Sequence, residues 1–499
     1  MRTGTIWLLI SAGILLCLNS LHAEGGRWGT DILVYSGPIS CFDVDYKMDG
    51  TIYLGLQKDE APNYNVCFYT STDHGYTWNL QYETPSLGRI SKMKILVGEP
   101  VHNYLYFFFV SPADNHPYVW RIASDFSGSG QGFLIDNQIA DPAGFDAARS
   151  IADTYFIFFI YYSLSDTSYY IYRSQDYGAT WQYRNSGSQA VWASQDLSIT
   201  WGPPSNCYIA RISAAPFEPP DSAEISVSVS ENNATGYWWG TGVTQNMRRD
   251  YDPHLAASHD PANPAVWLIN TYLYGGTDAN LCAWSIDSLY YGSPGDWFLT
   301  MISQTTASEY WGDIKSYKGS GNPYVNMAWM YDDGGSNRNV HWTWSSGDSP
   351  HAWHDDIVIN DYQAHPWPYG AAPRIVYSPG ASVGGGGVVY AGFGSQNLYF
   401  DAPWVTAVEE STSPVLSNFT MHPHILTTNS PVNFSLSKEG FVEISLYNTI
   451  GRIVYHLRPV FWNEGSHSLH LSQLSNGIYF CELKLDGSLS GTAKLILLR

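Results

Sequence analysis

Short apolar stretches recur at wide and regular intervals along the chain before residue 405. Each is rich in aromatic and β-branched residues and is bounded by Gly, Pro, Asp or Ser, which is typical of buried β-strands between turns. No long segment shows the period and caps of an α-helix. Seven such stretches are TIYLGL (51–56), NYLYFFFV (103–110), TYFIFFIYY (154–162), NCYIARIS (206–213), AVWLINTYL (265–273), YVNMAWMY (324–331) and GVVYAGFG (387–394).

A second apolar strand follows most of these stretches and ends at a serine near an acid. These serines stand at positions 71, 124, 174, 228, 285 and 345, a period of about fifty to sixty residues. Several short strands per unit at this period predict a β-propeller, because one four-stranded blade cannot bury both of its faces alone. Seven units predict seven blades, with six as the alternative. The orphan strand DILVYS, Asp31–Ser36, is predicted to complete the last blade, which runs out before its fourth strand.

One phrase is written almost identically twice: STDHGYTW (71–78) and SQDYGATW (174–181). Its aspartate can accept backbone N–H bonds within a turn, its glycine can take a positive φ, and its tryptophan can bury a large ring. The phrase therefore predicts a hairpin that is held by its own side chains. The residues concerned are Ser71, Asp73, Gly75, Thr77 and Trp78, and Ser174, Asp176, Gly178, Thr180 and Trp181.

These residues resemble the Asp-box, or BNR, repeat of sialidase-like propellers. In that family the box lies in an outer hairpin away from the active centre. The resemblance therefore implies the fold and implies no catalytic role for the box.

An acid recurs at one place in the predicted inner strands, about nine to eleven residues before each apolar second strand. The acids are Asp43, Asp146, Asp196, Asp252 and Asp313, with the cations Lys92 and Arg374 at the matching places of the two other units. One interpretation brings the acids together with Arg149 and Arg374 at the channel mouth, as a polar cluster that binds a sugar or a cation such as Ca²⁺. The other is that each acid caps its own strand entry by bonding backbone.

Two function classes remain open. The first is a secreted propeller that binds a glycan or protein at the cell surface. The second is a sialidase-like glycoside hydrolase, which would need three arginines around a carboxylate and a tyrosine nucleophile with an acidic partner. Arg149 and Arg374 are candidates, a third arginine is not evident, and the Arg-Ile-Pro motif of such enzymes is absent. Tyr310 is the candidate nucleophile.

No cofactor is evident from the sequence. The loops 259–264 and 331–337 could hold Ca²⁺ or be simple turns.

The N-terminus predicts an exported protein, and the net charge argues against nucleic acid as its partner. Residues 1–23 combine Arg2, an apolar run and a small-residue cleavage site, which predicts a secretory signal peptide. Removing Arg2 changes the formal net charge from −21 to −22, and so acidic an exported chain is a poor candidate for binding nucleic acid. No later segment is apolar enough to span a membrane. Five scattered cysteines remain, which predict buried free thiols: Cys41, Cys67, Cys207, Cys282 and Cys481.

The composition and the hydrophobic pattern change after the predicted propeller, residues 24–405. Residues 406–420 are polar and rich in Ser and Thr, as in a linker, and residues 421–499 alternate like a small antiparallel β-sandwich. VEISLYN (442–448), Gly451-Arg452, LSNGIY (474–479) and KLILL (494–498) resemble the immunoglobulin-like C-terminal sorting domain of the type IX secretion system. The usual opening motif appears only in part, at 421–424.

The resemblance of the tail implies a partner and a destination. The partner is the type IX secretion machinery, and the destination is the exterior or cell surface of a Gram-negative bacterium. The alternative is an ordinary adhesive sandwich.

Overall fold

The computed structural model divides the chain into two compact units between Val405 and Thr406. The predicted signal peptide, residues 1–23, lies outside the described residues. The structure describes residues 31–98, 103–150, 156–189, 195–212, 224–244, 249–261, 264–274, 278–287, 296–302, 308–317, 324–332, 338–346, 349–354, 356–360, 372–377, 386–392, 397–402, 419–422, 425–427, 432–436, 439–448, 452–469, 474, 477–485 and 488–498.

The described residues of the first unit form seven antiparallel sheets, numbered here in chain order. Sheet 1 consists of β2 (Ile39–Tyr46), β3 (Ile52–Lys58), β4 (Val66–Ser71) and β5 (Asn79–Glu83). Sheet 2 consists of β6 (Lys94–Val97), β7 (Tyr104–Val110), β8 (Pro117–Ala123) and β9 (Gln131–Leu134). Sheet 3 consists of β10 (Ala140–Arg149), β11 (Ile157–Ser163), β12 (Ser168–Ser174) and β13 (Gln182–Ser188).

The next three sheets repeat this order. Sheet 4 consists of β14 (Leu197–Gly202), β15 (Asn206–Ile212), β16 (Ile225–Ser230) and β17 (Trp238–Gly242), with the short helix α2 (Glu231–Ala234) before β17. Sheet 5 consists of β18 (Arg249–Ala257), β19 (Val266–Tyr274), β20 (Asp278–Ile286) and β21 (Phe298–Met301). Sheet 6 consists of β22 (Ser308–Ser316), β23 (Tyr324–Asp332), β24 (Arg338–Ser346), β25 (Ser349–Trp353) and β26 (Ile357–Val358), the last also paired with β24.

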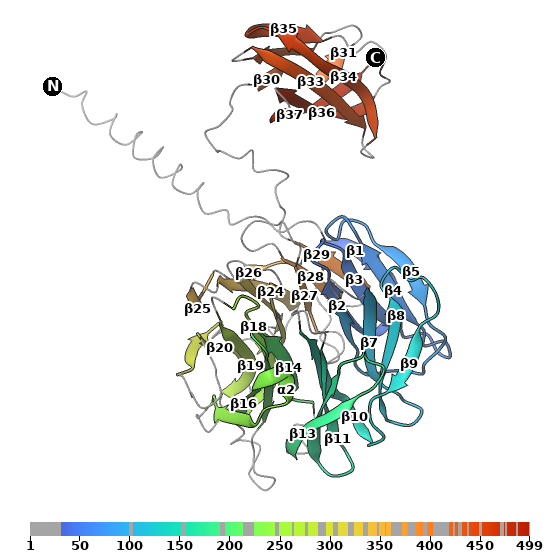
Figure 1. Cartoon of the computed structure of the whole chain (residues 1–499), viewed down its shortest axis with the longest axis vertical. Coiled ribbons are helices and arrows are strands. Elements are labelled where there is room, and N and C mark those ends of the chain that lie inside the picture. The colour runs from blue at the N-terminus through green and yellow to red at the C-terminus, as the bar shows by residue number, and fades with distance from the viewer. Residues whose placement is uncertain are drawn as a thin grey trace, which may run out of the picture. The chain divides into compact units, whose positions relative to one another are not determined.

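Sheet 7 closes the ring with the two ends of the unit. Its strands are β27 (Arg374–Tyr377), β28 (Gly386–Ala391), β29 (Leu398–Asp401) and, outermost, β1 (Ile32–Tyr35). β1 pairs with β29 in the register Ile32 to Phe400, so the predicted role of the orphan strand is confirmed. Each first strand contacts the first strand of the next sheet, and β27 contacts β2. The unit is a β-propeller, and Figure 1 shows its first strands β2, β14, β18 and β27 toward the middle and β5, β9 and β25 at the periphery.

The seven apolar stretches are the second strands of the seven sheets, as predicted. They read as continuous apolar runs because alternate side chains pack into two different cores. On β3, Leu54 packs with sheet 7, whereas Tyr53 packs with sheet 2. On β7, Phe107 joins the core with sheet 1, and Tyr106 joins the core with sheet 3. Burial between neighbouring sheets therefore holds the ring together.

The repeated phrase forms the turn between the third and fourth strands of sheets 1 and 3. Ser71 Oγ donates to Asp73 Oδ1 at 2.8 Å and accepts the Gly75 N–H at 2.8 Å. Asp73 also accepts the Thr77 N–H at 2.9 Å and the Thr77 hydroxyl at 2.6 Å. The second copy has the same bonds at Ser174, Asp176, Gly178 and Thr180. The predicted role of the phrase in the turn is confirmed.

Two details of that prediction were wrong. Trp78 and Trp181 are partly rather than fully buried, and each packs against core residues of its own and the preceding sheet. Trp78 lies edge-on to Phe400 at 5.6 Å, between ring centroids. The fourth echo is also shifted: Ser230, not Ser228, ends β16 as Ser71 ends β4.

The second unit contains two sheets that share one core. The first has β30 (Phe419–His422), β32 (Val432–Leu436) and β35 (Gly465–Leu469). The second has β31 (Ile425–Thr427), β37 (Ser488–Leu498), β36 (Gly477–Leu485), β33 (Gly440–Asn448) and β34 (Ile453–Trp462). Leu436 and Leu469 from the first sheet pack with Val442 and Leu483 from the second. The unit is thus a β-sandwich, although β31 runs parallel to β37 and β30 begins inside the predicted linker.

The cysteines are as the sequence predicted. All five described cysteines are free and buried: Cys41, Cys67, Cys207, Cys282 and Cys481. Burial raises the pKa of the Cys67 thiol to about 11 and that of Cys41 to about 12. These thiols are therefore neutral and unreactive near neutral pH.

Deleting residues 31–36 should lower the melting temperature of the propeller by at least about 4 °C, because sheet 7 loses its outer strand. A matched pair of point variants localises the effect. Val34 packs against the core of sheets 1 and 7, whereas Leu33 is 52% exposed. Val34→Asp should therefore destabilise the protein in a thermal melt, and Leu33→Asp should not. An unchanged melting temperature after the deletion would show that β1 does not support the ring.

Candidate functional site

The first strand of each propeller sheet lies at the edge of that sheet. The backbone N–H groups on the outer side of this strand therefore have no partner strand in the same sheet. Carboxylates from the preceding sheet accept these groups. Asp43 on β2 accepts the Ile95 N–H of β6 through Oδ2 at 2.8 Å. Asp45 on the same strand accepts the Val97 N–H at 2.8 Å. Sheet 1 is thereby tied to sheet 2 by charge-assisted hydrogen bonds.

The same contact recurs further round the ring. The other pairs are Asp146 with the Ile199 N–H at 3.0 Å, Asp196 with the Asp252 N–H at 2.7 Å, and Asp313 with the Ile375 N–H at 2.9 Å. These bonds join sheet 3 to sheet 4, sheet 4 to sheet 5, and sheet 6 to sheet 7. Neither sequence interpretation anticipated this arrangement: the acids bond the backbone of the next sheet, not mainly their own strand entries.

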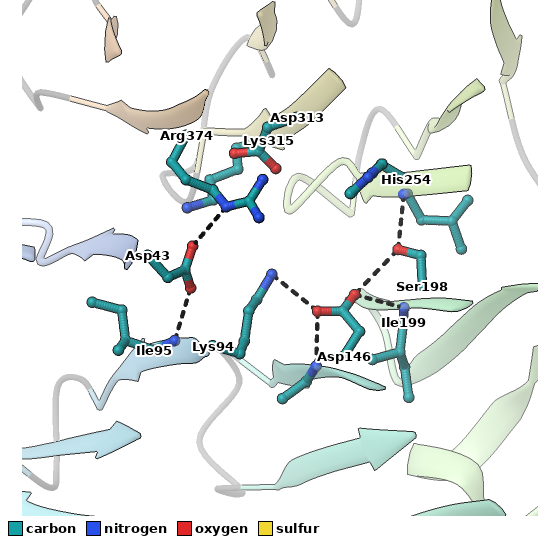
Figure 2. Close-up of polar contacts among 12 residues, drawn as sticks. Asp43, Lys94, Ile95, Asp146, Ser198, Ile199, His254, Asp313, Lys315 and Arg374 are labelled. Atoms are coloured by element: carbon teal, nitrogen blue, oxygen red, sulfur yellow. Dashed lines mark hydrogen bonds and ion pairs between the residues drawn. The ribbon is translucent and has the colours of Figure 1, made fainter. Parts of the chain in front are cut away.

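Cations fill the places between these acids (Figure 2). Lys94 Nζ of sheet 2 lies 3.0 Å from Asp146 Oδ1 of sheet 3. Arg374 Nε of sheet 7 lies 3.5 Å from Asp43 Oδ1 of sheet 1. Lys315 Nζ of sheet 6 donates to the Val44 carbonyl of sheet 1 at 2.6 Å. Figure 2 shows these side chains, with those of Asp313 and His254, around one central space.

The electrostatics of this space favour ionised carboxylates. Burial alone would raise the pKa of Asp146, but the charges of Lys94 and Lys92 outweigh it and the pKa of this carboxyl is lowered. Asp313 behaves in the same way: burial opposes ionisation, Lys315 and Lys94 favour it, and its pKa is lowered. Burial lowers the pKa of Lys94, yet the charges of Asp146, Asp43 and Asp313 together outweigh it and the net direction is upward. Both partners of the Lys94–Asp146 pair are therefore charged at neutral pH.

A cavity of about 110 Å³ lies among the first strands and is lined by residues of sheets 1 to 6. Asp146, Asp313, Lys94 and Lys315 line it, and so does Arg149 at the end of β10. Arg149 is only 6% exposed, and none of its three guanidinium nitrogens has a hydrogen-bond partner among the described residues. A buried guanidinium without a partner is costly, so this group is the unexplained feature of the channel.

The predicted site residues thus fall into two groups. Asp146, Arg149 and Asp313 line the cavity. The others lie in the same ring of first strands but are absent from the lining: Asp43, Asp196, Asp252 and Arg374. Asp252 has a φ of +54° at a β-bulge, and its Oδ1 lies 3.0 Å from His254 Nε2.

Sequence reasoning missed Lys94, Ser198 and Lys315. It assigned the cation of sheet 2 to Lys92, whose Nζ lies 5.4 Å from the centroid of the Phe145 ring instead. Ser198 Oγ donates to Asp146 at 3.2 Å and accepts the Leu255 N–H at 3.0 Å. The available signal was the two-residue alternation in SKMKIL, which puts both lysines on one face of the strand.

The candidate nucleophile Tyr310 lacks the expected setting. Its hydroxyl donates to Asp332 Oδ2 at 3.1 Å, and Arg338 Nε lies 3.0 Å from the same carboxylate. Burial and the charge of Asp332 raise the pKa of Tyr310, which is the opposite of activation. Tyr310 is also absent from the cavity lining.

The structure contains no assembled metal site in its described part. Among those residues, no three His, Cys, Asp or Glu side chains lie close enough to hold a metal ion. The two loops considered for Ca²⁺ fall partly outside the described residues, at 262–263 and 333–337. None of the described helices is long and apolar enough to cross a membrane.

Comparison with known proteins places the tail. Residues 428–498 match the family described as "Secretion system C-terminal sorting domain". No protein of curated function matches the chain. The protein is therefore a β-propeller followed by a secretion sorting domain.

Solved structures resemble the chain only distantly. The α-L-arabinofuranosidase of Fusarium graminearum, solved with an iminosugar inhibitor, is 12% identical over 76% of this chain and 98% of its own, with a TM-score of 0.41. The β-propeller domain of the Trilobed protease from Pyrococcus furiosus is 7% identical over 74% and 94%, with a TM-score of 0.44. A Hadza microbial sialidase is 9% identical over 76% and 69%, with a TM-score of 0.40. Likenesses this distant carry no information about the activity of this chain.

Asp146→Asn should destabilise the protein by about 3 kcal/mol at pH 7, because it removes one charge of a buried pair. The pKa of Asp146 is lowered by folding, so its stabilisation is present above the unfolded-state pKa of about 4 and is lost as the pH falls through the lower folded-state value. Denaturant melts at pH 7, 5 and 3 should therefore show the difference from wild type shrinking at the lowest pH.

The control is Asp49→Asn, which alters an exposed turn carboxylate bonded only to the nearby Thr51 N–H. It should cost less than about 1 kcal/mol at every pH. A loss for Asp146→Asn that stays constant from pH 7 to pH 3 would contradict the ion-pair assignment.

Proposed function

We propose that this protein is an exported β-propeller that binds an anionic group, such as the carboxylate of an acidic sugar, in its central channel at or outside the cell surface. The observation that carries the proposal is Arg149. Its guanidinium lines the channel cavity, is almost fully buried and has no hydrogen-bond partner among the described residues. A bound anion would supply the missing charge and acceptors.

The physical argument rests on the cost of a buried charge. An unpaired buried guanidinium carries a desolvation penalty of several kcal/mol, and a charge-assisted contact with a carboxylate or phosphate offsets it. The lysines that line the cavity already have acceptors, Lys94 in Asp146 and Lys315 in a backbone carbonyl. Arg374, which lies outside the lining, pairs with Asp43. Arg149 is therefore the cation that the protein leaves for a ligand.

Glycoside hydrolysis is less well supported than binding. A general acid needs a raised carboxyl pKa, so that it holds a proton at neutral pH. Asp146 and Asp313 are two of the acids that line the cavity, and their pKa values are both lowered. Tyr310 has a raised pKa and is absent from the lining. Neither of these two aspartates is thus set up as a proton donor, and Tyr310 is not set up as an activated nucleophile.

Arg149→Met tests the channel site. Sodium galacturonate and sodium sulfate in the tens of millimolar should raise the melting temperature of the wild type by about 2 °C or more, and this rise should be at most about half as large in the variant. Without ligand, Arg149→Met should melt at or above the wild-type temperature, because an unpaired buried charge has been removed.

The control for this test is Arg374→Met, which breaks the pair with Asp43 and should lower the melting temperature whether or not an anion is present. A melting temperature for unliganded Arg149→Met as low as that of Arg374→Met would assign Arg149 a structural partner. That result, or an anion-induced rise that is as large in Arg149→Met as in the wild type, would overturn the proposed channel site.

The tail supports export, with the type IX secretion machinery as its partner. A chain ending at Val405 should fold, since the unit boundary lies there, but should accumulate in the periplasm of its native host. Immunoblots of the periplasm and the culture medium measure this, with the full chain as control. Release of the truncated chain into the medium as efficiently as the full chain would contradict the role of residues 428–498 as an export address.

A further inference from the structure

A second hollow lies at the outer strands of two neighbouring propeller sheets, away from the first strands that line the channel. It has a volume of about 660 Å³ and is formed by the outer strands of sheets 3 and 4, chiefly β13 and β17. We call it the lateral groove. Its size falls in the range of small-molecule sites and is several times that of the channel cavity. The lining residues used below are Arg184, Arg211, Ser226, Tyr237, Trp238 and Thr241.

The charge of the lateral groove is opposite to that of the chain. The protein has 45 acidic and 24 basic residues, yet the lining of the groove contains two arginines and no acid. The Nε atoms of Arg184 and Arg211 are buried and have no hydrogen-bond partner among the described residues. The Arg211 guanidinium lies over the Tyr169 ring, 5.5 Å from its centroid, a contact that joins sheet 4 to sheet 3. The groove thus offers guanidinium donors that no described carboxylate neutralises.

A third arginine, Arg173, lies outside the lining of the groove and adds to the positive charge near Arg184. Arg173 donates to the Asn233 carbonyl of α2 at 2.6 Å, so it also joins the two sheets. Burial, and then the like charge of Arg184, lower the pKa of Arg173 to about 10. Burial likewise lowers the pKa of Arg184. An anion in the groove would offset the desolvation cost of these guanidinium groups and reduce the repulsion between Arg173 and Arg184.

The remaining surface of the groove suits a sugar. Tyr237 is 83% exposed, and Trp238 beside it has a buried Nε1 donor without a partner among the described residues. Aromatic faces of this kind pack against apolar ring faces, while Ser226 and Thr241 offer hydroxyls. The lining also has free space at Gly242, since a Cβ there would meet nothing within 4 Å.

We propose that the lateral groove is a second ligand site, which binds a carboxylated saccharide. Arg184 and Arg211 hold the carboxylate, Trp238 and Tyr237 pack against the sugar ring, and the hydroxyl and backbone groups of β16 and β17 bond its hydroxyls. This site is independent of the channel, because it draws on different strands of sheets 3 and 4. The exported protein would then engage an acidic polysaccharide along its side.

The experiment uses the whole mature chain and titrates two probes by calorimetry, tri-galacturonate and 3′-sialyllactose. At least one should bind, and its uncharged counterpart, the tri-galacturonate methyl ester or lactose, should bind at least tenfold more weakly. Arg184→Gln and Arg211→Gln should each weaken binding at least tenfold, and Trp238→Ala at least fivefold. Binding should weaken as salt is raised, because the contact is between charges.

Two matched variants keep the test specific. Arg452→Gln changes an exposed arginine of the second unit and should leave binding unchanged. Arg149→Met removes the effect of small anions on the channel, and it should keep the part of trimer binding that Arg184→Gln and Arg211→Gln abolish. Melting temperatures within about 2 °C of wild type show that the groove variants are folded. The reverse control is that the small-anion effect on the channel survives Arg184→Gln.

Three results would overturn the groove proposal. The first is that neither acidic saccharide binds. The second is binding that Arg184→Gln and Arg211→Gln leave unchanged. The third is equal binding of the charged and uncharged saccharides. In the second case, loss of binding in Arg149→Met would place the saccharide in the channel, which supports the proposed function and removes the groove.

Discussion

The hydrogen bond from the edge amide of one first strand to a carboxylate of the preceding sheet is the contact on which the ring depends. A propeller sheet leaves the inner edge of its first strand without a partner strand, and buried N–H groups without acceptors are costly. Asp43, Asp146 and Asp313 supply these acceptors across three of the junctions between sheets. The bonds also explain why so many acids can crowd one channel: each faces donors, and lysines or arginines stand between them.

The chain is acidic overall, yet in two places it has arginine nitrogens without a described acceptor. In the channel, Arg149 is buried beyond the reach of any described acceptor, while in the lateral groove Arg184 and Arg211 share a hollow without an acid. A protein with nearly twice as many acids as bases could easily have paired these groups. Arg149 lacks an acceptor for its whole guanidinium, whereas Arg184 and Arg211 lack one at Nε and Arg184 also donates to Gln182. The cost of leaving such groups unpaired is the reason for proposing anionic ligands at both places.

The repeated phrase at residues 71–78 and 174–181 lies away from both candidate ligand sites. The repeated phrase at Asp73 and Asp176 is satisfied within its own turn, and its tryptophans join sheets at the outside of the ring. The candidate ligand sites are built instead from side chains that stand alone in the sequence. A short motif can hold one turn by itself, whereas a binding site needs groups from several strands, so the two obey different constraints.

The sequence alone determined the seven second strands, the turn at Asp73, the buried thiols and the closing role of β1, because spacing, alternation and local hydrogen bonds decide these features. It located the recurring acids but not their partners. Asp43 bonds Ile95, fifty-two positions away, and the choice of Lys94 over Lys92 for Asp146 follows from how neighbouring sheets are staggered. The isolation of Arg149 and the groove between β13 and β17 depend on which groups the packed sheets bring close. Only the tertiary structure could decide them, because distances between sheets are set by core packing and leave no periodic trace in the chain.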